Sequence, residues 1–238
     1  MRTDVLVIGS GMAGAIAALT AADDGKNVVI ITKTEHLLSG NTPHAQGGII
    51  FKGLDDSPEK LKQDILSAGS ESCWKPAVEK ICNEGPEMVQ SFLLNRLNIP
   101  FDKNPSGDFH LTSEAAHNDA RILHQKDQTG KGIQKIILDE FKDNKNISVL
   151  PSHFAVDLLT LSHHSKNPRD IYKNPACFGA IVLDMNRNEV FPILAKNTIL
   201  ATGGLGKIFL HTTNPDEALG DGIAMAWRAG ARCFNLEY

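Results

Sequence analysis

The chain has 238 residues, of which 42% are hydrophobic and 22% are charged, and its formal net charge is −4. These values are typical of a folded globular protein and exclude disordered and collagen-like chains. The slightly acidic balance argues against nucleic acid as a partner. No stretch reaches the roughly 18 uninterrupted apolar residues of a membrane span, so we expect no membrane partner.

The cysteines and the N-terminus predict a cytoplasmic location. Four cysteines are spread through the chain, at Cys73, Cys82, Cys177 and Cys233. Their spacing matches no zinc or CxxC pattern, so we expect free thiols in a reducing compartment and no metal site. The first residues lack the basic lead and apolar stretch of a signal peptide.

The first elements form a βαβ unit over residues 4–33. Val5–Ile8 and Val28–Ile31 are short apolar runs typical of buried parallel strands, and the Ala-rich run Ala13–Ala22 predicts the helix between them. The turn between the first strand and the helix carries a GxGxxG pattern, the context in which this pattern indicates a dinucleotide site. The candidate binding residues are Gly9, Ser10, Gly11, Met12, Ala13 and Gly14.

Each glycine of this turn has a physical role in that interpretation. Gly9 permits the tight turn, Gly11 lets a diphosphate approach the main chain, and Gly14 lets the helix pack on the sheet. The alternative is a glycine-rich turn that binds nothing. Lys33 stands where such folds usually carry an acidic residue, and it either faces a phosphate or is solvated.

The middle of the chain is predicted to be a polar loop followed by helices. Residues 39–50 form the loop, and a helix runs from the Ser57–Pro58 start to about Ala68. Residues 76–98 are expected to be helical in two pieces, interrupted at Gly85–Pro86. Residues 100–130 look irregular. Glu114, His117, Arg121 and His124 in this segment either bind a small anion or zwitterion, or form local ion pairs.

The residues after 130 are predicted to form a further helix and more strands. A helix around 133–141 and a strand at 148–150 precede an antiparallel meander over 155–161, 178–183 and 189–195, with the polar stretch 162–175 as a solvated surface loop. A separate parallel strand is expected at 198–201, a helix at 221–229, and a strand-like segment at 233–238. The fold class is therefore α/β, a Rossmann-like FAD/NAD(P)-binding fold with a parallel sheet and an antiparallel meander insertion.

Two glycine-bearing motifs end this region. Thr202 and Gly203 follow a predicted strand at its carboxyl end, where ligands bind in open α/β sheets. Asp221 stands at a helix start, where it either caps the helix or binds a ribose hydroxyl.

Taken together, the motifs GSGMAG, AQGGI, LTSEAAHNDARILHQKDQTG, LATGG and TTNPDEALGDGIAMAWRAGA resemble, in order and along the whole chain, the L-aspartate oxidases. These belong with the flavoproteins of fumarate reductase and succinate dehydrogenase. The resemblance implies an FAD cofactor, with Ser10–Ala13 at the diphosphate, Lys33 near the adenosine, and Asp221 also in contact. It places the loop Asn41, Thr42, Pro43, His44, Ala45, Gln46, Gly47 and Gly48 around the flavin.

The resemblance also implies the chemistry. Glu114 matches a glutamate that orients the amino group of L-aspartate, which is oxidised to iminoaspartate in NAD biosynthesis with O2 or fumarate as acceptor. The product would pass to quinolinate synthase. Asn41 replaces the histidine that binds flavin covalently in the succinate dehydrogenase branch, which implies noncovalent FAD. Family members usually carry a small hydroxyl residue at Asn41 and an aromatic residue at His44.

Residues 1–238 are expected to be the N-terminal part of one FAD-binding domain. Family members continue into a capping domain, which supplies the catalytic arginine, and then return to the flavin domain. We therefore expect these residues alone to be inactive. The alternatives are a soluble fumarate reductase-like flavoprotein, a non-catalytic nucleotide-binding module, or an NADPH-binding domain with Lys33 on the 2′-phosphate.

Overall fold

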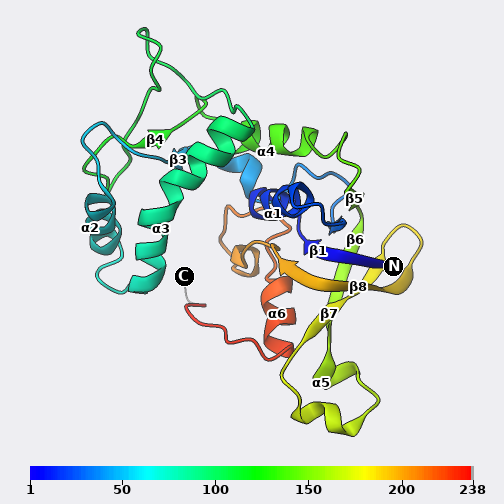
Figure 1. Ribbon diagram of the computed structural model, residues 1–238. Coiled ribbons are helices and arrows are strands. Elements are labelled where there is room, and N and C mark those ends of the chain that lie inside the picture. The colour runs from blue at the N-terminus through cyan, green and yellow to red at the C-terminus, as the bar shows by residue number, and fades with distance from the viewer. Residues whose placement is uncertain (237–238) are drawn as a thin grey trace. The chain divides into compact units, whose positions relative to one another are not determined.

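The computed structural model describes residues 1–236 and divides into two compact units (Figure 1). Unit 1 contains residues 1–42 and the described residues from 137 onward, and unit 2 contains residues 43–136. The two units are described one at a time.

Unit 1 is built on a six-stranded sheet with the order β5-β2-β1-β8-β7-β6. Its strands are β1 (Arg2–Ile8), β2 (Val28–Ile31), β5 (Ile147–Leu150), β6 (His153–Thr160), β7 (Cys177–Asp184) and β8 (Glu189–Leu200). β5, β2, β1 and β8 run parallel, whereas β8, β7 and β6 form an antiparallel meander. The predicted α/β class with a mostly parallel sheet and an antiparallel part is confirmed.

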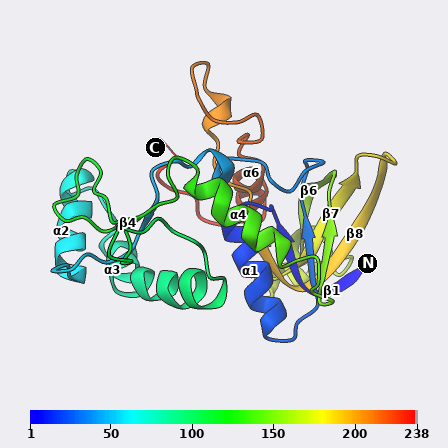
Figure 2. The same ribbon diagram turned by 90° about the horizontal axis from the view of Figure 1, so that it is seen from above.

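Two helices complete this unit. α1 (Met12–Asp23) packs against β1 and β2, and α6 (Asp221–Arg228) packs against β6 (Figure 2). The small alanine side chains on the buried face of α1 let the helix pack closely on the sheet, and Ala15 and Ala18 are fully inaccessible to solvent. The buried cluster of the sheet includes Leu6, Val29 and Ile193, and Met225 of α6 packs into it. This packing fixes the carboxyl ends of β1, β2 and β8 relative to the starts of α1 and α6.

Strand β8 differs from the prediction because it is one long strand and not two. Its first half pairs antiparallel with β7, from Glu189 to Leu194, and its second half pairs parallel with β1, from Leu194 to Leu200. Since a strand has two hydrogen-bonding edges, it can serve the meander on one edge and the parallel sheet on the other. The meander is therefore continuous with the parallel sheet.

Unit 2 contains mostly helices and irregular segments. Its helices are α2 (Pro58–Ala68) and α3 (Lys75–Met88), which continues directly into a π-helical segment, Val89–Arg96. α4 (Thr129–Asp139) spans the division between the units, and the two-residue strands β3 (Ile49–Ile50) and β4 (Ile122–Leu123) pair antiparallel. α2 begins as predicted, because the Ser57 hydroxyl accepts a hydrogen bond from the Lys60 amide at 3.2 Å.

The predicted interruption at Gly85–Pro86 is wrong. Pro86 lies inside α3, and the helical backbone continues past it. A proline removes one helical hydrogen bond, and here the chain keeps its direction and widens into the π-helical segment from Val89. The buried side chains Val78 and Cys82 hold α3 against α2, which favours continuation over a break.

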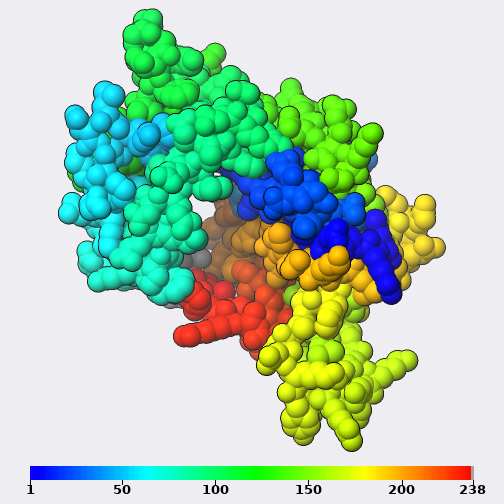
Figure 3. Space-filling view, in the orientation of Figure 1, coloured from blue at the N-terminus to red at the C-terminus, as the bar shows by residue number. Residues whose placement is uncertain are grey.

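Two predictions near the end of the chain also need correction. The polar stretch 162–175 contains two short helical turns, α5 (Leu161–His164) and a 3-10 turn at Pro168–Tyr172, although it does project into solvent as expected (Figure 3). Residues 233–236 form no strand, since no partner strand lies beside them within residues 1–236. Residues 237 and 238 of that predicted strand lie outside the described residues.

Candidate functional site

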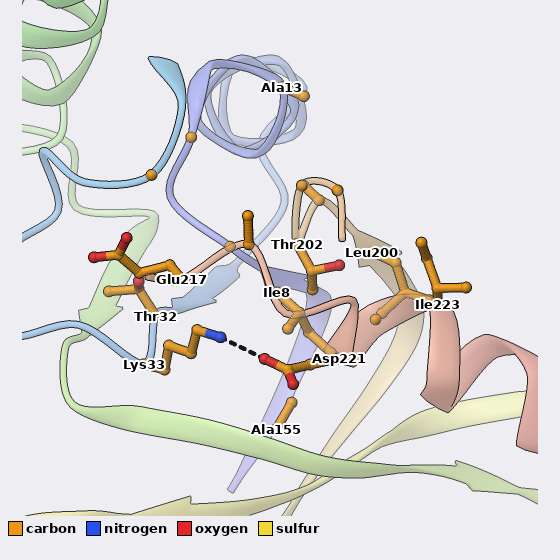
Figure 4. A pocket seen from close by; sticks show the side chains of 18 of the residues that line it. Ile8, Ala13, Thr32, Lys33, Ala155, Leu200, Thr202, Glu217, Asp221 and Ile223 are labelled. Carbon is orange, nitrogen blue, oxygen red and sulfur yellow. Dashed lines mark hydrogen bonds and ion pairs between the residues drawn. The ribbon is translucent and has the colours of Figure 1, made fainter. Parts of the chain in front are cut away.

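A cavity with a volume of about 580 Å³, within the usual range of ligand sites, lies in unit 1. Its wall includes the last residues of β1, β2 and β8 and the first residues of α1 and α6 (Figure 4). Eleven of the residues predicted to bind cofactor line it: Gly9, Ser10, Gly11, Met12, Ala13, Lys33, Asn41, Thr42, Thr202, Gly203 and Asp221.

Gly9 and Gly14 hold the wall together through close backbone packing. A Cβ on Gly9, whose φ is +111°, would lie 2.2 Å from the carbonyl oxygen of Ala201 in the segment after β8. A Cβ on Gly14 would lie 2.1 Å from the carbonyl oxygen of Gly9, so that only glycine lets α1 start this close to β1. Gly14 itself does not line the cavity. Its place agrees with the packing role that the fingerprint gives it.

Gly11 and Gly204, by contrast, have room for a Cβ. The nearest atom to a Cβ on Gly11 is the Thr42 hydroxyl oxygen at 3.4 Å, and a Cβ on Gly204 would meet nothing within 4 Å. The cavity wall therefore exposes bare main chain beside the start of α1. Backbone amides and the positive end of a helix dipole suit a diphosphate, so these residues fit the phosphate part of a dinucleotide.

Thr42 has a contact that the sequence did not reveal. Its hydroxyl oxygen accepts a hydrogen bond from the Met12 amide at 3.1 Å, which ties the loop after β2 to the first turn of α1. Asn41 is tied in a similar way, since its side-chain amide Nδ2 donates to the side-chain oxygen Oδ1 of Asn214 at 3.0 Å. Glu217 and Arg232 also line the cavity and were not among the predicted residues. No local sequence pattern marks these two side chains.

Lys33 and Asp221 form an ion pair across the cavity wall (Figure 4). Their side chains are 25% and 28% exposed, so both groups remain accessible. Asp221 is the first residue of α6, but Gly220 occupies the N-cap position, and the Asp221 carboxylate turns to Lys33 instead of capping the helix. The carboxylate missing from the end of β2 in the sequence is thus supplied by α6.

The second half of the predicted flavin loop, Pro43–Gly48, belongs to unit 2. It does not line the cavity. Two hydrogen bonds from the segment at the start of α4 hold it: the Gly130 amide donates to the Ala45 carbonyl at 2.9 Å, and the Thr129 hydroxyl donates to the Gln46 carbonyl at 3.3 Å. Gly48, with φ of +130°, passes so close to Leu123 that a Cβ would lie 2.4 Å from its carbonyl oxygen.

Glu114 also belongs to unit 2, and its carboxylate lies against Gly47. A Cβ on Gly47 would be 2.0 Å from Glu114 Oε1, so the missing side chain makes room for the carboxylate. The Glu114 residue is exposed. An exposed carboxylate in this place is able to accept hydrogen bonds from an ammonium group.

Arg121 forms its shortest ion pairs with carboxylates far away in the sequence and not with a local one, and His124 lies beside a carboxylate. Arg121 is fully buried and donates to Asp56 and Asp64, while His124 Nδ1 lies 3.2 Å from Asp102 Oδ2. Burial raises the pKa of each of the two carboxyl groups at Arg121, but the hydrogen bonds from the guanidinium outweigh it and leave the pKa of both Asp56 and Asp64 below the ordinary value. Arg121 therefore has a structural role.

Two negative findings concern the described part of the chain. Residues 1–236 hold no group of three or more His, Cys, Asp or Glu side chains that could bind a metal ion. None of the helices in that range combines the length and apolar character that crossing a bilayer requires. The four cysteines are all free thiols.

The sequence profile of one family, described as the FAD binding domain, matches residues 4–237. The chain belongs to this FAD-binding family. FAD is accordingly its cofactor, and the glycine-lined cavity of unit 1 fits the phosphate part of that dinucleotide.

Curated relatives share about 40% of the sequence over the whole chain. L-aspartate oxidase 1 of Ralstonia nicotianae is 40% identical over 100% of this chain and 43% of its own length, and the L-aspartate oxidase of Vibrio cholerae is 43% identical over 100% and 44%. The chloroplastic L-aspartate oxidase of Arabidopsis thaliana is 40% identical over 99% of this chain and 34% of its own length. The chain thus spans less than half the length of these relatives.

Solved structures show the same fold. The E. coli quinol fumarate reductase FrdA superposes with a TM-score of 0.84 over 96% of this chain and 37% of that chain, at 23% identity. The Mycobacterium smegmatis Sdh1 complex in the apo form gives 0.81 over 96% and 39%, at 25% identity. The α/β architecture is therefore that of the fumarate reductase flavoproteins.

Proposed function

We propose that this chain supplies the flavin site of an enzyme that oxidises L-aspartate to iminoaspartate in the biosynthesis of NAD. The observation that carries the proposal is the position of Glu114, whose exposed carboxylate lies on Gly47 in the loop that the family resemblance assigns to the flavin. A carboxylate there favours a substrate with an ammonium group over a plain dicarboxylate. The identity of about 40% to curated L-aspartate oxidases supports the same substrate.

The residues of unit 1 would hold FAD without a covalent bond. The main chain at Gly9–Ala13 and Thr202–Gly203 would contact the diphosphate, and the Lys33–Asp221 pair would face the adenosine half. Asn41 has no imidazole with which to form a covalent link. When bound, FAD supplies the two-electron acceptor for the oxidation. The protein contributes orientation and charge, with Glu114 holding the substrate ammonium.

Further parts of the proposal rest on the family resemblance and, for the location, on the scattered cysteines of the sequence. O2 or fumarate would reoxidise the cofactor, quinolinate synthase would receive the unstable product, and the enzyme would work in the cytoplasm. Residues 1–238 would form the N-terminal part of the FAD-binding domain and, on their own, would bind FAD without turning over aspartate. A soluble fumarate reductase-like flavoprotein is the second candidate, since the solved structures with the same fold include fumarate reductases.

An assay of the intact gene product with two substrates separates these functions. With FAD present, we expect L-aspartate to be oxidised and succinate to be turned over much more slowly. Glu114→Gln should reduce kcat/KM for L-aspartate by at least about tenfold, because the charge-assisted hydrogen bond to the ammonium is lost. Turnover of succinate without turnover of L-aspartate would refute the proposal and favour the fumarate reductase-like function.

A further inference from the structure

Unit 2 contains a buried charge cluster that the proposed chemistry does not use. The Arg121 guanidinium is 0% exposed and donates from Nε and from one terminal nitrogen to the two oxygens of Asp56, both at 2.7 Å. Its other terminal nitrogen donates to Asp64 at 2.5 Å. The side chains of Asp56 and Asp64 are only 4% and 3% exposed. Burying charged groups is costly unless they are paired and hydrogen-bonded, as these three are, so removing one of them would leave an uncompensated buried charge.

The cluster holds the segment between Glu114 and Arg121, which has no regular secondary structure. Asp64, on α2, accepts hydrogen bonds from the Asn118 backbone amide at 3.1 Å and from the Asn118 side chain. Arg121 also contacts His117 Nδ1 at 3.1 Å. The far end of the segment and its middle are therefore both fastened to one carboxylate on a helix.

The same segment contains a strained residue. Ala116 has φ of +78°, a left-handed conformation that residues with a Cβ rarely adopt. Such a conformation is strained and persists only when the surroundings impose it. Two contacts impose it here. The hydrogen bond from the His117 amide to the Glu114 carbonyl at 3.0 Å spans Ala116, and the Asn118–Asp64 contact holds the chain just after it.

Glu114 is the residue that this arrangement places. The residue is exposed and its carboxylate lies on Gly47, in contrast to the buried ion pairs of Arg121. The position of its carboxylate depends on the backbone of the segment, and that backbone is fixed by α2 through Asp64. A side chain on a loop is placed accurately only when a second set of contacts locks the loop.

We propose that Asp64 is a positioning residue for Glu114: through Asn118 and Arg121 it holds the strained segment 114–121 so that the Glu114 carboxylate stays on Gly47. The proposal rests on the proposed role of Glu114 toward the substrate ammonium. Asp64 touches neither cofactor nor substrate in this scheme. It acts from α2, and it sets where the ammonium of an amino acid substrate binds.

Two variants test this anchoring by hydrogen–deuterium exchange on the FAD-loaded chain. Asp64→Asn weakens the charge-assisted bonds, and Asn118→Ala removes one contact while leaving the Asp64–Arg121 pair intact. Both should speed exchange in peptides covering 114–121 by at least about tenfold, with α3 unchanged. Glu59→Gln, an exposed change on the same helix, is the matched control and should leave 114–121 unchanged. Unaltered exchange at 114–121, or an equal increase throughout α2 and α3, would overturn the proposal.

Kinetics of the intact gene product provide the second readout. Asn118→Ala should lower kcat/KM for L-aspartate by about tenfold at unchanged FAD content, and it should have almost no further effect in a Glu114→Gln background. Independent, additive effects of the two substitutions would overturn the positioning role. If the unsubstituted protein oxidises no L-aspartate, the proposed function fails, while the exchange experiment still decides whether Asp64 anchors the segment.

Discussion

The glycines of the first turn have two different roles: one allows close backbone packing, and the other leaves room at the cavity. Gly14 lies against the Gly9 carbonyl, where a Cβ would come within 2.1 Å, whereas Gly11 faces the cavity with its nearest neighbour, the Thr42 hydroxyl, at 3.4 Å. The packing of Gly14 agrees with the role that the motif predicts, whereas the contact of Gly11 with a diphosphate stays a prediction.

Alanine substitutions should separate the two roles. Gly11→Ala should leave the free energy of unfolding of the cofactor-free chain within about 0.5 kcal/mol of the original, because the added methyl meets no closer neighbour than 3.4 Å. It should weaken FAD binding by at least about tenfold, since the methyl occupies space at the phosphate position. Gly14→Ala should instead lower the stability of the cofactor-free chain by about 1–3 kcal/mol.

Urea denaturation without FAD and FAD titration by fluorescence measure both effects. A Gly11→Ala chain that binds FAD as tightly as the original would contradict the assignment of the cavity. An undiminished stability of Gly14→Ala would contradict the packing role.

The Lys33–Asp221 ion pair could not be predicted from the sequence. The two residues are 188 positions apart, and no local pattern links them. Lys33 alone indicated only a departure from the usual acidic residue at the end of β2. The compensating carboxylate became apparent once the sheet had placed the start of α6 beside β2.

Among the elements, the strongest local signals were the most predictable. The βαβ unit and the start of α2 agree with the sequence because a short apolar run and a Ser–Pro start are each decided within a few residues. The continuity of β8 and the passage of α3 through Pro86 were not predictable. The continuity of β8 depends on its pairing with β1, at the other end of the chain, and the passage of α3 through Pro86 depends on its packing against α2. A local sequence pattern shows neither of these tertiary contacts.

The N-cap of α2 allows a test at the scale of one element. Ser57→Ala should lower the free energy of unfolding by about 1 kcal/mol, because the Lys60 amide loses its acceptor. Ser57→Asp should restore most of the loss, since a carboxylate also accepts this bond and favours a helix start. Ser67→Ala in the last turn of α2 is the control, and chemical denaturation is the measurement. An equal loss in both alanine variants would contradict the capping role.

At the scale of the whole molecule, the Arg121 cluster predicts how stability depends on pH. The pKa values of Asp56 and Asp64 are lower in the folded chain than the value of about 3.9 for an unfolded aspartate. The two carboxylates therefore contribute fully to the free energy of unfolding above about pH 3.9. That contribution is lost as the pH falls through their lower pKa values in the folded chain.

This dependence is measurable with one variant. At pH 7, Asp64→Asn should unfold at a lower urea concentration than the original chain, because Arg121 loses one of its two buried carboxylates. Below about pH 4 the difference should shrink, since the aspartate of the unfolded original chain becomes protonated first and the folded carboxyl group follows at lower pH. Urea midpoints at pH 7 and at pH 3 provide the comparison. A difference that stays constant between the two would show that the ionised form of Asp64 contributes nothing.

The central claim is that the cavity at the carboxyl ends of β1, β2 and β8 binds FAD without a covalent link. The most direct test is to saturate the purified chain with FAD, remove the excess, precipitate the protein with acid and record the flavin absorbance of supernatant and pellet. We predict about one FAD per chain, all of it in the supernatant. A yellow pellet, or a chain that retains no flavin before precipitation, would contradict the account.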